Sequence, residues 1–281
     1  MRVGVTMCLT DGSIRPAELA GAVEDRGLDE LVLPERSHVP TSRTEVSPAG
    51  PPLPDAHRRA LDPFVALGAA GAATDRLRLT TGVCLVAQHD PIVLAKTVAT
   101  LDLLSGGRVT LGIGFGWHPV ELANHGLTVA NRRAVAREKV AAMRTLWADD
   151  EAAFDGVHVS FSPIWSWPKP VQRPGPPVYL GGGPAVFGDL VAYGDGWMPY
   201  APVHDVAGGE GELRRLASAA GRDPDGIGLI VLGVRSRPDE LDRYRALGAT
   251  AAVFELPTAG RDDTLRRLDR LTVVAGTTGS T

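Results

Sequence analysis

One segment of this sequence, RVTLGIGFGWHPVE, carries glycine at three alternate positions. Gly112, Gly114 and Gly116 therefore share one face of a predicted strand. Glycine weakens the interior of a strand and is typical of a place where a ligand or another backbone comes close. A flat ring could lie against this face, although small residues also suit the interior of a barrel. The spacing is not the GxGxxG of a dinucleotide-binding turn, and the acidic residue of that motif is missing.

A second glycine cluster, in PPVYLGGGPAVFGDL, predicts a site for a phosphate or another anion. Gly181, Gly182 and Gly183 separate a predicted strand from a helix that begins near Pro184 or Ala185. Backbone N–H groups that glycine leaves exposed at such a turn favour a negatively charged group. An ordinary tight turn is the alternative interpretation.

Ionisable residues follow the second predicted strand, in LVLPERSHVP. Glu35, Arg36 and His38 stand at its carboxyl end. In barrels of alternating strands and helices this end carries the chemistry, so the three are candidates for acid–base catalysis or for contact with an anion. A rim of salt bridges is the competing interpretation.

Two further histidines are candidates. His89 ends LRLTTGVCLVAQHDP, where it could contact a ligand or serve the structure alone. His118 and Glu121 stand three residues apart and would share a face of a short helix, so either could transfer a proton or pair locally. The spacing of the histidines predicts no metal site.

The composition excludes several classes of function. The formal net charge is −4 and no polybasic run is present, so nucleic acid is not an expected partner. No stretch of about 18 apolar residues predicts a membrane span. The amino terminus lacks the apolar segment of a signal peptide, which favours a cytoplasmic location. Cys8 and Cys84 are expected to be reduced, buried residues.

Short runs rich in β-branched residues alternate with helical periodicity along the whole chain. Strands separated by helices pair in parallel, and eight such units close a barrel. We therefore expect an α/β fold, a (β/α)8 TIM barrel formed by residues 1–281 as a single domain. The predicted strands are Val3–Leu9, Glu30–Pro34, Leu77–Val86, Val109–Gly114, Val178–Gly181, Gly196–Tyr200, Ile227–Val234 and Thr250–Leu256.

Two long connections are expected as insertions after strands 2 and 4. Residues 36–61 and 117–177 both leave carboxyl ends of strands, so we expect them over the mouth of the barrel. Substrate specificity is expected in residues 36–61 and 154–177, although a disordered loop without function is the alternative for the former. Trp165 and Trp167 are expected to pack and anchor the second insertion.

These segments together resemble the luciferase-like oxidoreductases. The stretch from TTGVCLVAQHDP to GFGWHPVELANHG is similar to the third- and fourth-strand region of that superfamily, and SPIWSWPKPVQRPGPPVYLGGGP with YGDGWMP is similar to its fifth- and sixth-strand region. The tail RYRALGATAAVFELPTAGRDDTLRRLDRL also matches, so the resemblance spans nearly the whole chain. The branch that the chain resembles most is the one that depends on the deazaflavin coenzyme F420.

The resemblance implies where a cofactor would lie at the carboxyl-terminal mouth of the barrel. A non-prolyl cis peptide on the third strand would support its ring, and a turn after the fifth strand would hold its phosphate. The implied cofactor-binding residues are Gly82, Val83 and Cys84 around the cis peptide at Gly82–Val83, Gly114, Phe115, Gly116 and Trp117 flanking the ring, and Gly181, Gly182, Gly183 and Pro184 in the turn.

Glu35 and Arg36 lie where the superfamily often carries an Asp-His or Glu-His pair near the ring, although Arg36 stands where histidine is frequent and His118 where asparagine or leucine is frequent. From the residues themselves, Glu35 or His118 is the expected proton donor or acceptor, and the substrate is expected to contact Arg36, His38 and His89. Members of the superfamily are commonly dimers, so a homodimer is expected.

One departure concerns the phosphate turn. Where relatives often carry arginine after the turn, this chain has Gly188 and Asp189. An acidic side chain there is expected to weaken the hold on phosphate.

Three functions follow as hypotheses. The first is hydride transfer between F420 and a small organic substrate. The second is an FMN-dependent monooxygenase on the same scaffold, and the third is a barrel that binds a cofactor without turnover. A phosphate-binding barrel isomerase would share the glycine turn, but it would not explain the face formed by Gly112, Gly114 and Gly116.

Overall fold

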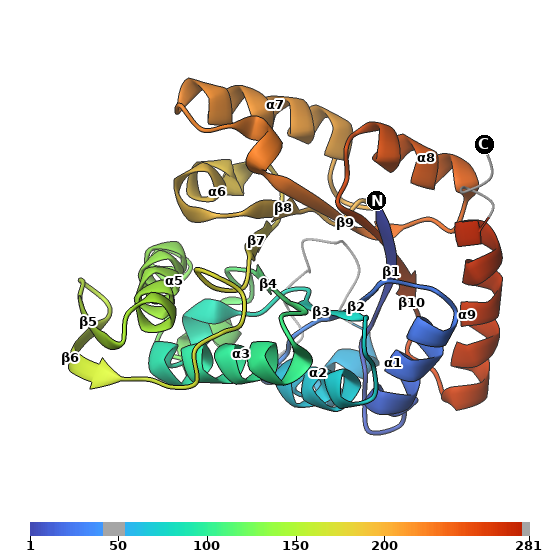
Figure 1. Ribbon diagram of the computed structural model, residues 1–281, viewed down its shortest axis with the longest axis horizontal. Helices are drawn as coiled ribbons and strands as arrows, with labels where there is room; N and C mark the ends of the chain where they lie inside the picture. The colour runs from blue at the N-terminus through green and yellow to red at the C-terminus, as the bar shows by residue number, and fades with distance from the viewer. Residues whose placement is uncertain (42–53, 277–281) are drawn as a thin grey trace.

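The computed structural model describes residues 1–41 and 54–276, and eight parallel strands within them close a barrel (Figure 1). The order around the barrel is β1-β10-β9-β8-β7-β4-β3-β2, so the first and last strands of the chain pair and complete the ring. The strands are β1 (Arg2–Met7), β2 (Glu30–Leu33), β3 (Arg78–Thr81), β4 (Val109–Ile113), β7 (Val178–Gly181), β8 (Gly196–Met198), β9 (Gly228–Val234) and β10 (Ala251–Leu256). The predicted barrel is confirmed.

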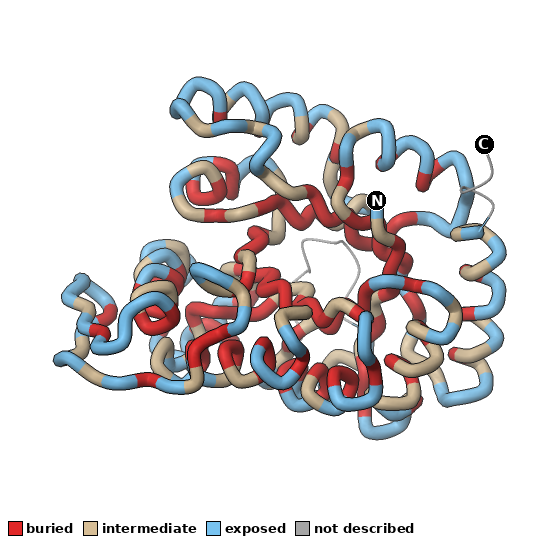
Figure 2. Tube along the Cα trace, viewed as in Figure 1, coloured by how far each residue is buried: buried red, intermediate tan, exposed pale blue. Residues whose placement is uncertain are grey.

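Helices surround the barrel and cover its outer face (Figures 1 and 2). Sequence signals set their ends: the Asp62 and Asp90 side chains accept backbone N–H groups at two amino termini, each before a proline, and Gly106 ends α3 in the left-handed conformation. In the described part of the chain, no helix is both long and apolar enough to cross a membrane. The α-helices are α1 (Pro16–Asp25), α2 (Pro63–Ala72), α3 (Pro91–Ser105), α4 (Pro119–Asn124), α5 (Arg132–Ala148), α6 (Phe187–Tyr193), α7 (Val206–Ala219), α8 (Pro238–Ala246) and α9 (Arg261–Gly276).

The interior of the barrel is packed by side chains of alternate strand positions. Val32, Tyr179, Met198, Ile230 and Leu232 form a buried cluster there, separate from the larger core between strands and helices. In Figure 2 the strands are almost continuously buried. This burial on both faces is why their sequences lack a polar side.

The third strand ends earlier than the sequence indicates. The prediction Leu77–Val86 was too long, because β3 stops at Thr81 and the chain then bends through a cis peptide at Gly82–Val83. Cys84 still exchanges backbone hydrogen bonds with β4: its N–H donates to Gly112 and its carbonyl accepts from Gly114. A 3-10 turn, η2 (Val86–Gln88), follows.

A two-stranded hairpin was missed within the second long connection. Strands β5 (Glu151–Asp155) and β6 (Ser160–Trp165) pair in antiparallel fashion and lie beside α5, outside the barrel (Figure 1). The Asp155-Gly156 dipeptide at the turn was the available signal. Trp165 is 78% exposed and Trp167 is 54% exposed, so the expectation that they anchor the insertion by packing was wrong.

A substitution at Gly112 tests how tightly β4 packs against its neighbours. A Cβ atom at this position would lie 2.1 Å from the Thr81 carbonyl oxygen and 2.7 Å from the Met198 side chain. We expect Gly112→Ala to lower the free energy of unfolding by about 3 kcal/mol, since a backbone oxygen cannot rotate away. Gly211→Ala, at an open position on α7, should instead raise it by about 1 kcal/mol. Urea denaturation of both variants checks this, and an unchanged midpoint for Gly112→Ala would contradict the packing described.

Candidate functional site

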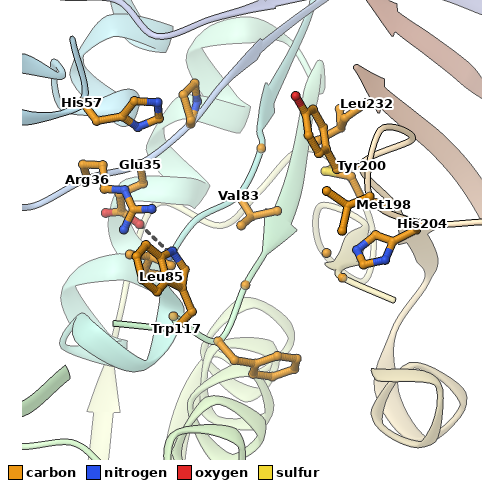
Figure 3. A pocket seen from close by; sticks show the side chains of 18 of the residues that line it. Glu35, Arg36, His57, Val83, Leu85, Trp117, Met198, Tyr200, His204 and Leu232 are labelled. Atoms are coloured by element: carbon orange, nitrogen blue, oxygen red, sulfur yellow. Dashed lines mark hydrogen bonds between the residues drawn. The ribbon is translucent and has the colours of Figure 1, made fainter. Parts of the chain in front are cut away.

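A cavity of about 420 Å³ opens at the carboxyl-terminal ends of the strands (Figure 3). Its walls are largely apolar, with a few ionisable groups at the two ends. The lining residues are Pro34, Glu35, Arg36, His57, Gly82, Val83, Leu85, Gly114, Phe115, Gly116, Trp117, Arg132, Gly181, Gly182, Met198, Tyr200, Val203, His204 and Leu232. A concave apolar site with a few polar groups at this end of a barrel is where a ligand is expected.

The glycines that line the cavity make room for Val83. A Cβ atom on Gly114 would lie 2.5 Å from Val83 Cγ2, and one on Gly181 would lie 2.7 Å from Val83 Cγ1. Val83 therefore sits between the ends of β4 and β7, and Figure 3 shows its side chain in the middle of the site. Gly112 is covered by Thr81 and Met198 and does not line the cavity, so packing explains this glycine and the idea that all three share a ring-binding face was wrong.

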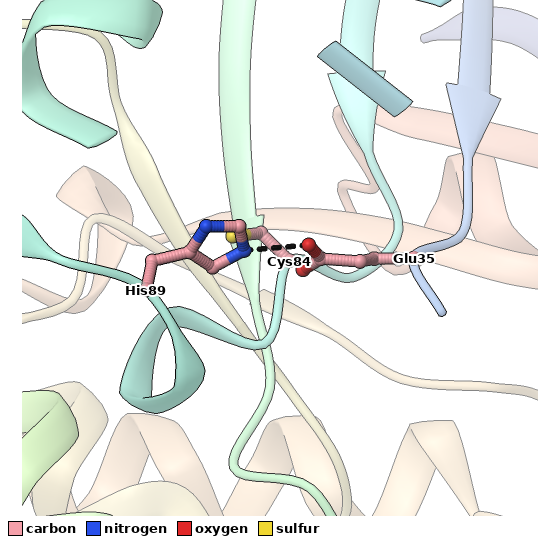
Figure 4. Close-up of side chains that lie close together, drawn as sticks. All are labelled: Glu35, Cys84 and His89. Atoms are coloured by element: carbon pink, nitrogen blue, oxygen red, sulfur yellow. Dashed lines mark hydrogen bonds and ion pairs between the residues drawn. The ribbon is translucent and has the colours of Figure 1, made fainter. Parts of the chain in front are cut away.

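Glu35 is the most constrained polar residue of the site. One carboxylate oxygen lies 2.5 Å from His89 Nε2 (Figure 4). The other accepts the backbone N–H of Leu85 at 2.5 Å. The Cys84 thiol donates to the same carboxylate. Burial by itself raises the pKa of Glu35, but the hydrogen bond and charge of His89, with the bonds from Leu85 and Cys84, outweigh it and hold the pKa below its ordinary value.

A carboxylate, a thiol and an imidazole meet at this point. A carboxylate oxygen of Glu35, Cys84 Sγ and a ring nitrogen of His89 lie within 4.8 Å of one another. Burial raises the pKa of the Cys84 thiol well above its ordinary range, and the negative Glu35 adds to the effect. The thiol is therefore protonated and acts as a hydrogen-bond donor to Glu35. Both cysteines are free, as expected.

Arg36 joins the cavity to helix α4. Its guanidinium donates to Glu121 at 2.8 Å and stacks 5.6 Å from the centre of the Trp117 ring. Gln88 donates to the other oxygen of the same carboxylate at 3.2 Å. The expectation of a salt-bridged rim is thus met at Arg36, which nevertheless lines the cavity.

Four of the lining residues suit an anion. Gly181 and Gly182 line the cavity together with Arg132 and His204. Arg132 donates one N–H to the Val129 carbonyl, whereas its buried Nε has no partner among the described residues. A buried donor without an acceptor in the protein is a feature that a bound anion would complete.

Asp189 does not present a free negative charge beside this turn. Its carboxylate is buried and pairs with Arg133 at 2.6 Å and with Arg137 at 3.2 Å. Arg133 also donates to the Ala185 carbonyl. The two arginines outnumber the single acid, so the expected weakening of phosphate binding by Asp189 lacks its physical cause.

Several predicted site residues do not line the cavity. Among the described residues these are Cys84, Gly183, Pro184, His38, His89 and His118. Gly183 underlies His204, and Pro184 begins a 3-10 turn, η3 (Pro184–Val186). His118 is only 4% exposed and packs beside Trp117, and His38 bonds Ser37 and Asn124 outside the cavity.

Other lining residues were missed by the sequence reasoning. Tyr200 and His204 follow β8, so the rule that singled out Glu35 at a strand end would have found them. His57 lies in the 3-10 turn η1 (Asp55–Arg59), where no periodicity pointed to it. No described residue of 154–177 lines the cavity, so the expected specificity segment there was wrong, and residues 42–53 of the other segment lie outside the described residues.

Comparisons with known proteins agree with this geometry. Residues 13–270 match the model of the luciferase-like monooxygenase family. The chain is 42% identical to an uncharacterized protein of Mycobacterium tuberculosis over 277 residues, which cover 96% of this chain and 97% of that one.

Relatives with named activities use two kinds of cofactor. An F420-dependent glucose-6-phosphate dehydrogenase of M. tuberculosis is 31% identical over 242 residues, covering 79% of this chain and 65% of that one. An FMNH(2)-dependent dimethylsulfone monooxygenase of Pseudomonas putida is 30% identical over 129 residues, covering 45% of this chain and 35% of that one. A solved F420-dependent secondary alcohol dehydrogenase superposes with a TM-score of 0.75 at 18% identity, covering 99% of both chains, which shows the shared fold.

The buried carboxylate predicts a specific pH dependence of stability. Because the pKa of Glu35 is lowered in the folded chain, its contribution is complete above the ordinary value of 4.5 and is lost as the pH falls through the lower folded pKa. We expect Glu35→Gln to lower the free energy of unfolding at pH 7 by about 3 kcal/mol. The difference from the wild-type chain should shrink as the pH falls below 4.5.

Urea denaturation of both chains between pH 3 and 7 measures this difference. Glu212→Gln, on the exposed face of α7, is the matched control and should leave stability within about 0.5 kcal/mol of the wild-type value. A Glu35→Gln penalty that stays constant across this pH range would contradict the ionised carboxylate.

Proposed function

Because the chain belongs to the luciferase-like monooxygenase family, we propose that it transfers hydride between the deazaflavin coenzyme F420 and a small organic substrate. The observation that carries this proposal is that Val83, Gly181 and Gly182 of the glycine turn, and Arg132 all line one cavity. F420 is favoured over FMN by the relatives, since the F420-dependent dehydrogenase aligns over 79% of the chain and the FMN-dependent monooxygenase over 45%.

Orphaned polar atoms support the fit of a large anionic cofactor. Two buried side-chain atoms without partners among the described residues, Arg132 Nε and His57 Nδ1, belong to residues that line the cavity. Arg132 and the backbone of Gly181 and Gly182 would hold the phosphate. Arg133 and Arg137, on the same helix as Arg132, add positive charge that suits the acidic tail of F420.

The remaining lining residues suit a ring and exclude water. When bound, the deazaflavin supplies a carbon that exchanges hydride with the substrate. Val83 would support the ring, while Phe115 and Trp117 would flank it, as the resemblance implies. Leu85, which also lines the cavity, would add apolar surface. Glu35, held ionised by its three donors, would place a fixed negative charge beneath the site.

An FMN-dependent monooxygenase is the second candidate. The description of the matching family and the monooxygenase of P. putida favour it. FMN also needs a phosphate site, and it lacks the acidic tail that would reach Arg133 and Arg137. The two candidates therefore differ in what lies beyond the phosphate turn.

Cofactor titration separates the candidates. We expect the apoprotein to bind F420 more tightly than FMN, and Arg132→Gln to weaken F420 binding about tenfold because a charge-assisted hydrogen bond is lost. Quenching of cofactor fluorescence measures both dissociation constants. Arg215→Gln on the outer face of α7 is the matched control and should bind F420 as the wild-type chain does. Tight binding of FMN alone, with oxygen consumption when reduced FMN is supplied, would favour the monooxygenase instead.

We also propose that the protein is a homodimer whose interface includes helices α2 and α3. Large apolar side chains are exposed along this face: Val65 is 75% exposed, Val93 63% and Leu104 77%. They border a groove between the two helices. Trp167 lies nearby, since its carbonyl accepts the Lys96 ammonium of α3. A patch of this kind on a folded surface is typical of a protein interface.

A charged side chain on this face should separate the subunits. We expect Leu104→Glu to weaken self-association at least tenfold, since a carboxylate would be buried without a partner. Light scattering after size exclusion measures the mass. Val273→Glu, at an exposed position of α9, is the control and should remain dimeric. A wild-type chain that is monomeric at micromolar concentration would contradict the proposed dimer.

A further inference from the structure

We propose that His38 and His125, two histidines beside the mouth of the barrel, bind a divalent transition-metal cation such as Zn²⁺ between their rings. His38 belongs to the segment that follows β2, and His125 comes directly after helix α4. Because they come from separate segments, the spacing of histidines along the sequence does not reveal the pair. The inference goes beyond the proposed function, since neither histidine lines the cavity and no cofactor is needed.

Two ring nitrogens of these histidines converge on one atom. His38 Nδ1 lies 2.9 Å from the hydroxyl oxygen of Ser37, and His125 Nε2 lies 3.1 Å from the same oxygen. The two ring centres are 5.5 Å apart. Imidazole nitrogens bind zinc at about 2.0–2.1 Å, so an ion in place of the hydroxyl would require each ring to approach by about 1 Å. Ser37 and His125 are exposed and His38 is half-buried, so their side chains have room to rotate.

The ligand atoms select the class of cation. Imidazole nitrogen suits Zn²⁺, Cu²⁺ and Ni²⁺, whereas Mg²⁺ and Ca²⁺ prefer oxygen ligands. Two nitrogens supply half of a tetrahedral shell. Water would complete the shell, because the His125 side of the site is open to solvent.

Asn124 can orient the His38 ring for this role. Its side-chain amide lies 2.9 Å from His38 Nε2. A histidine that binds a metal through one nitrogen commonly donates the N–H of the other nitrogen to an oxygen. The amide presents its oxygen to Nε2 when it turns by 180°. His38 Nδ1 would then keep a free lone pair on the side that faces His125.

The charges beside the site do not oppose a cation. The guanidinium of Arg36 is paired with the carboxylate of Glu121 at 2.8 Å. Gln88 stands between this pair and the site: its amide nitrogen donates to Glu121 at 3.2 Å, and its carbonyl accepts the Ser37 hydroxyl at 3.4 Å. The cation would therefore adjoin the rim of the cavity through a chain of hydrogen bonds and would hold the segment after β2 against α4.

A second cluster of potential ligands, formed by Glu35, Cys84 and His89, is less suited to a cation. Its members already satisfy one another, with His89 Nε2 at 2.5 Å from a Glu35 oxygen. The Cys84 side chain is completely buried, and its thiol donates to the same carboxylate. A cation would have to break these hydrogen bonds and reach a thiol without access to solvent.

Calorimetric titration of the untagged apoprotein with Zn²⁺ tests the site. We expect one Zn²⁺ to bind per chain with a micromolar dissociation constant, and an excess of Mg²⁺ not to displace it. His38→Gln and His125→Gln should each weaken binding at least tenfold, since the loss of even an outer-shell partner costs about tenfold or more. His158→Gln, at an exposed position of the hairpin, is the matched control and should bind Zn²⁺ as the wild-type chain does.

Co²⁺ in place of Zn²⁺ reports which ligands bind. Imidazole ligands give only weak visible bands, whereas a thiolate ligand adds intense charge-transfer absorption in the near ultraviolet. The wild-type chain should lack this absorption and Ser37→Cys should show it, because a thiolate would replace the hydroxyl between the two rings. Ser37→Cys should also bind Zn²⁺ about 100-fold more tightly. This variant keeps both histidines, so it tests the site even if a histidine variant folds poorly.

The outcomes decide between this site and any other. A wild-type chain that binds no Zn²⁺, or an affinity that is unchanged in both histidine variants, would overturn the inference. Charge-transfer absorption in the wild-type chain would also overturn it, because the cation would then be bound by Cys8 or Cys84. None of these measurements uses F420. Failure of the cation site therefore leaves the proposed function standing, and failure of F420 to bind leaves the cation site standing.

Discussion

The floor of the cavity depends on the carboxylate of Glu35. A buried, ionised carboxylate must be surrounded by donors, and here they come from the segment that follows β3: the Leu85 amide, the Cys84 thiol and the His89 ring. The interaction ties the ends of β2 and β3 together at the point where the chain turns through the Gly82–Val83 peptide. The position of Val83 in the site therefore depends on the hydrogen bonds that a neighbouring lining residue, Glu35, requires.

The barrel was predictable because its strands are buried on both faces. Eight apolar runs separated by helical periodicity admit few arrangements, and the closure of β1 on β10 needs no further signal. The end of β3 was missed because Val83 to Val86 read as strand residues, whereas the bend after Thr81 is set by contacts with Glu35 and β4. The hairpin was missed because its outer strand, β6, has no alternating pattern of burial.

The site was only partly predictable for a related reason. Glycines and charged residues at strand ends are visible in a sequence, and Glu35, Gly114 and Gly181 do line the cavity. What a residue does there depends on partners from other elements. Asp189 looked unfavourable to an anion until Arg133 and Arg137, four residues apart on α5, were seen to bind it. His57 reaches the cavity from a turn without periodicity, so nothing local marked it.

The fit of Val83 between two glycines links three positions that are far apart in the chain. Any side chain at Gly114 or Gly181 would meet Val83, so neither glycine can be replaced while Val83 keeps its size. During divergence, a larger residue at either glycine would fit only after a smaller residue has replaced Val83. Related sequences should therefore show correlated substitution at these positions, and the size of residue 83 would mark lineages whose cavities differ in depth.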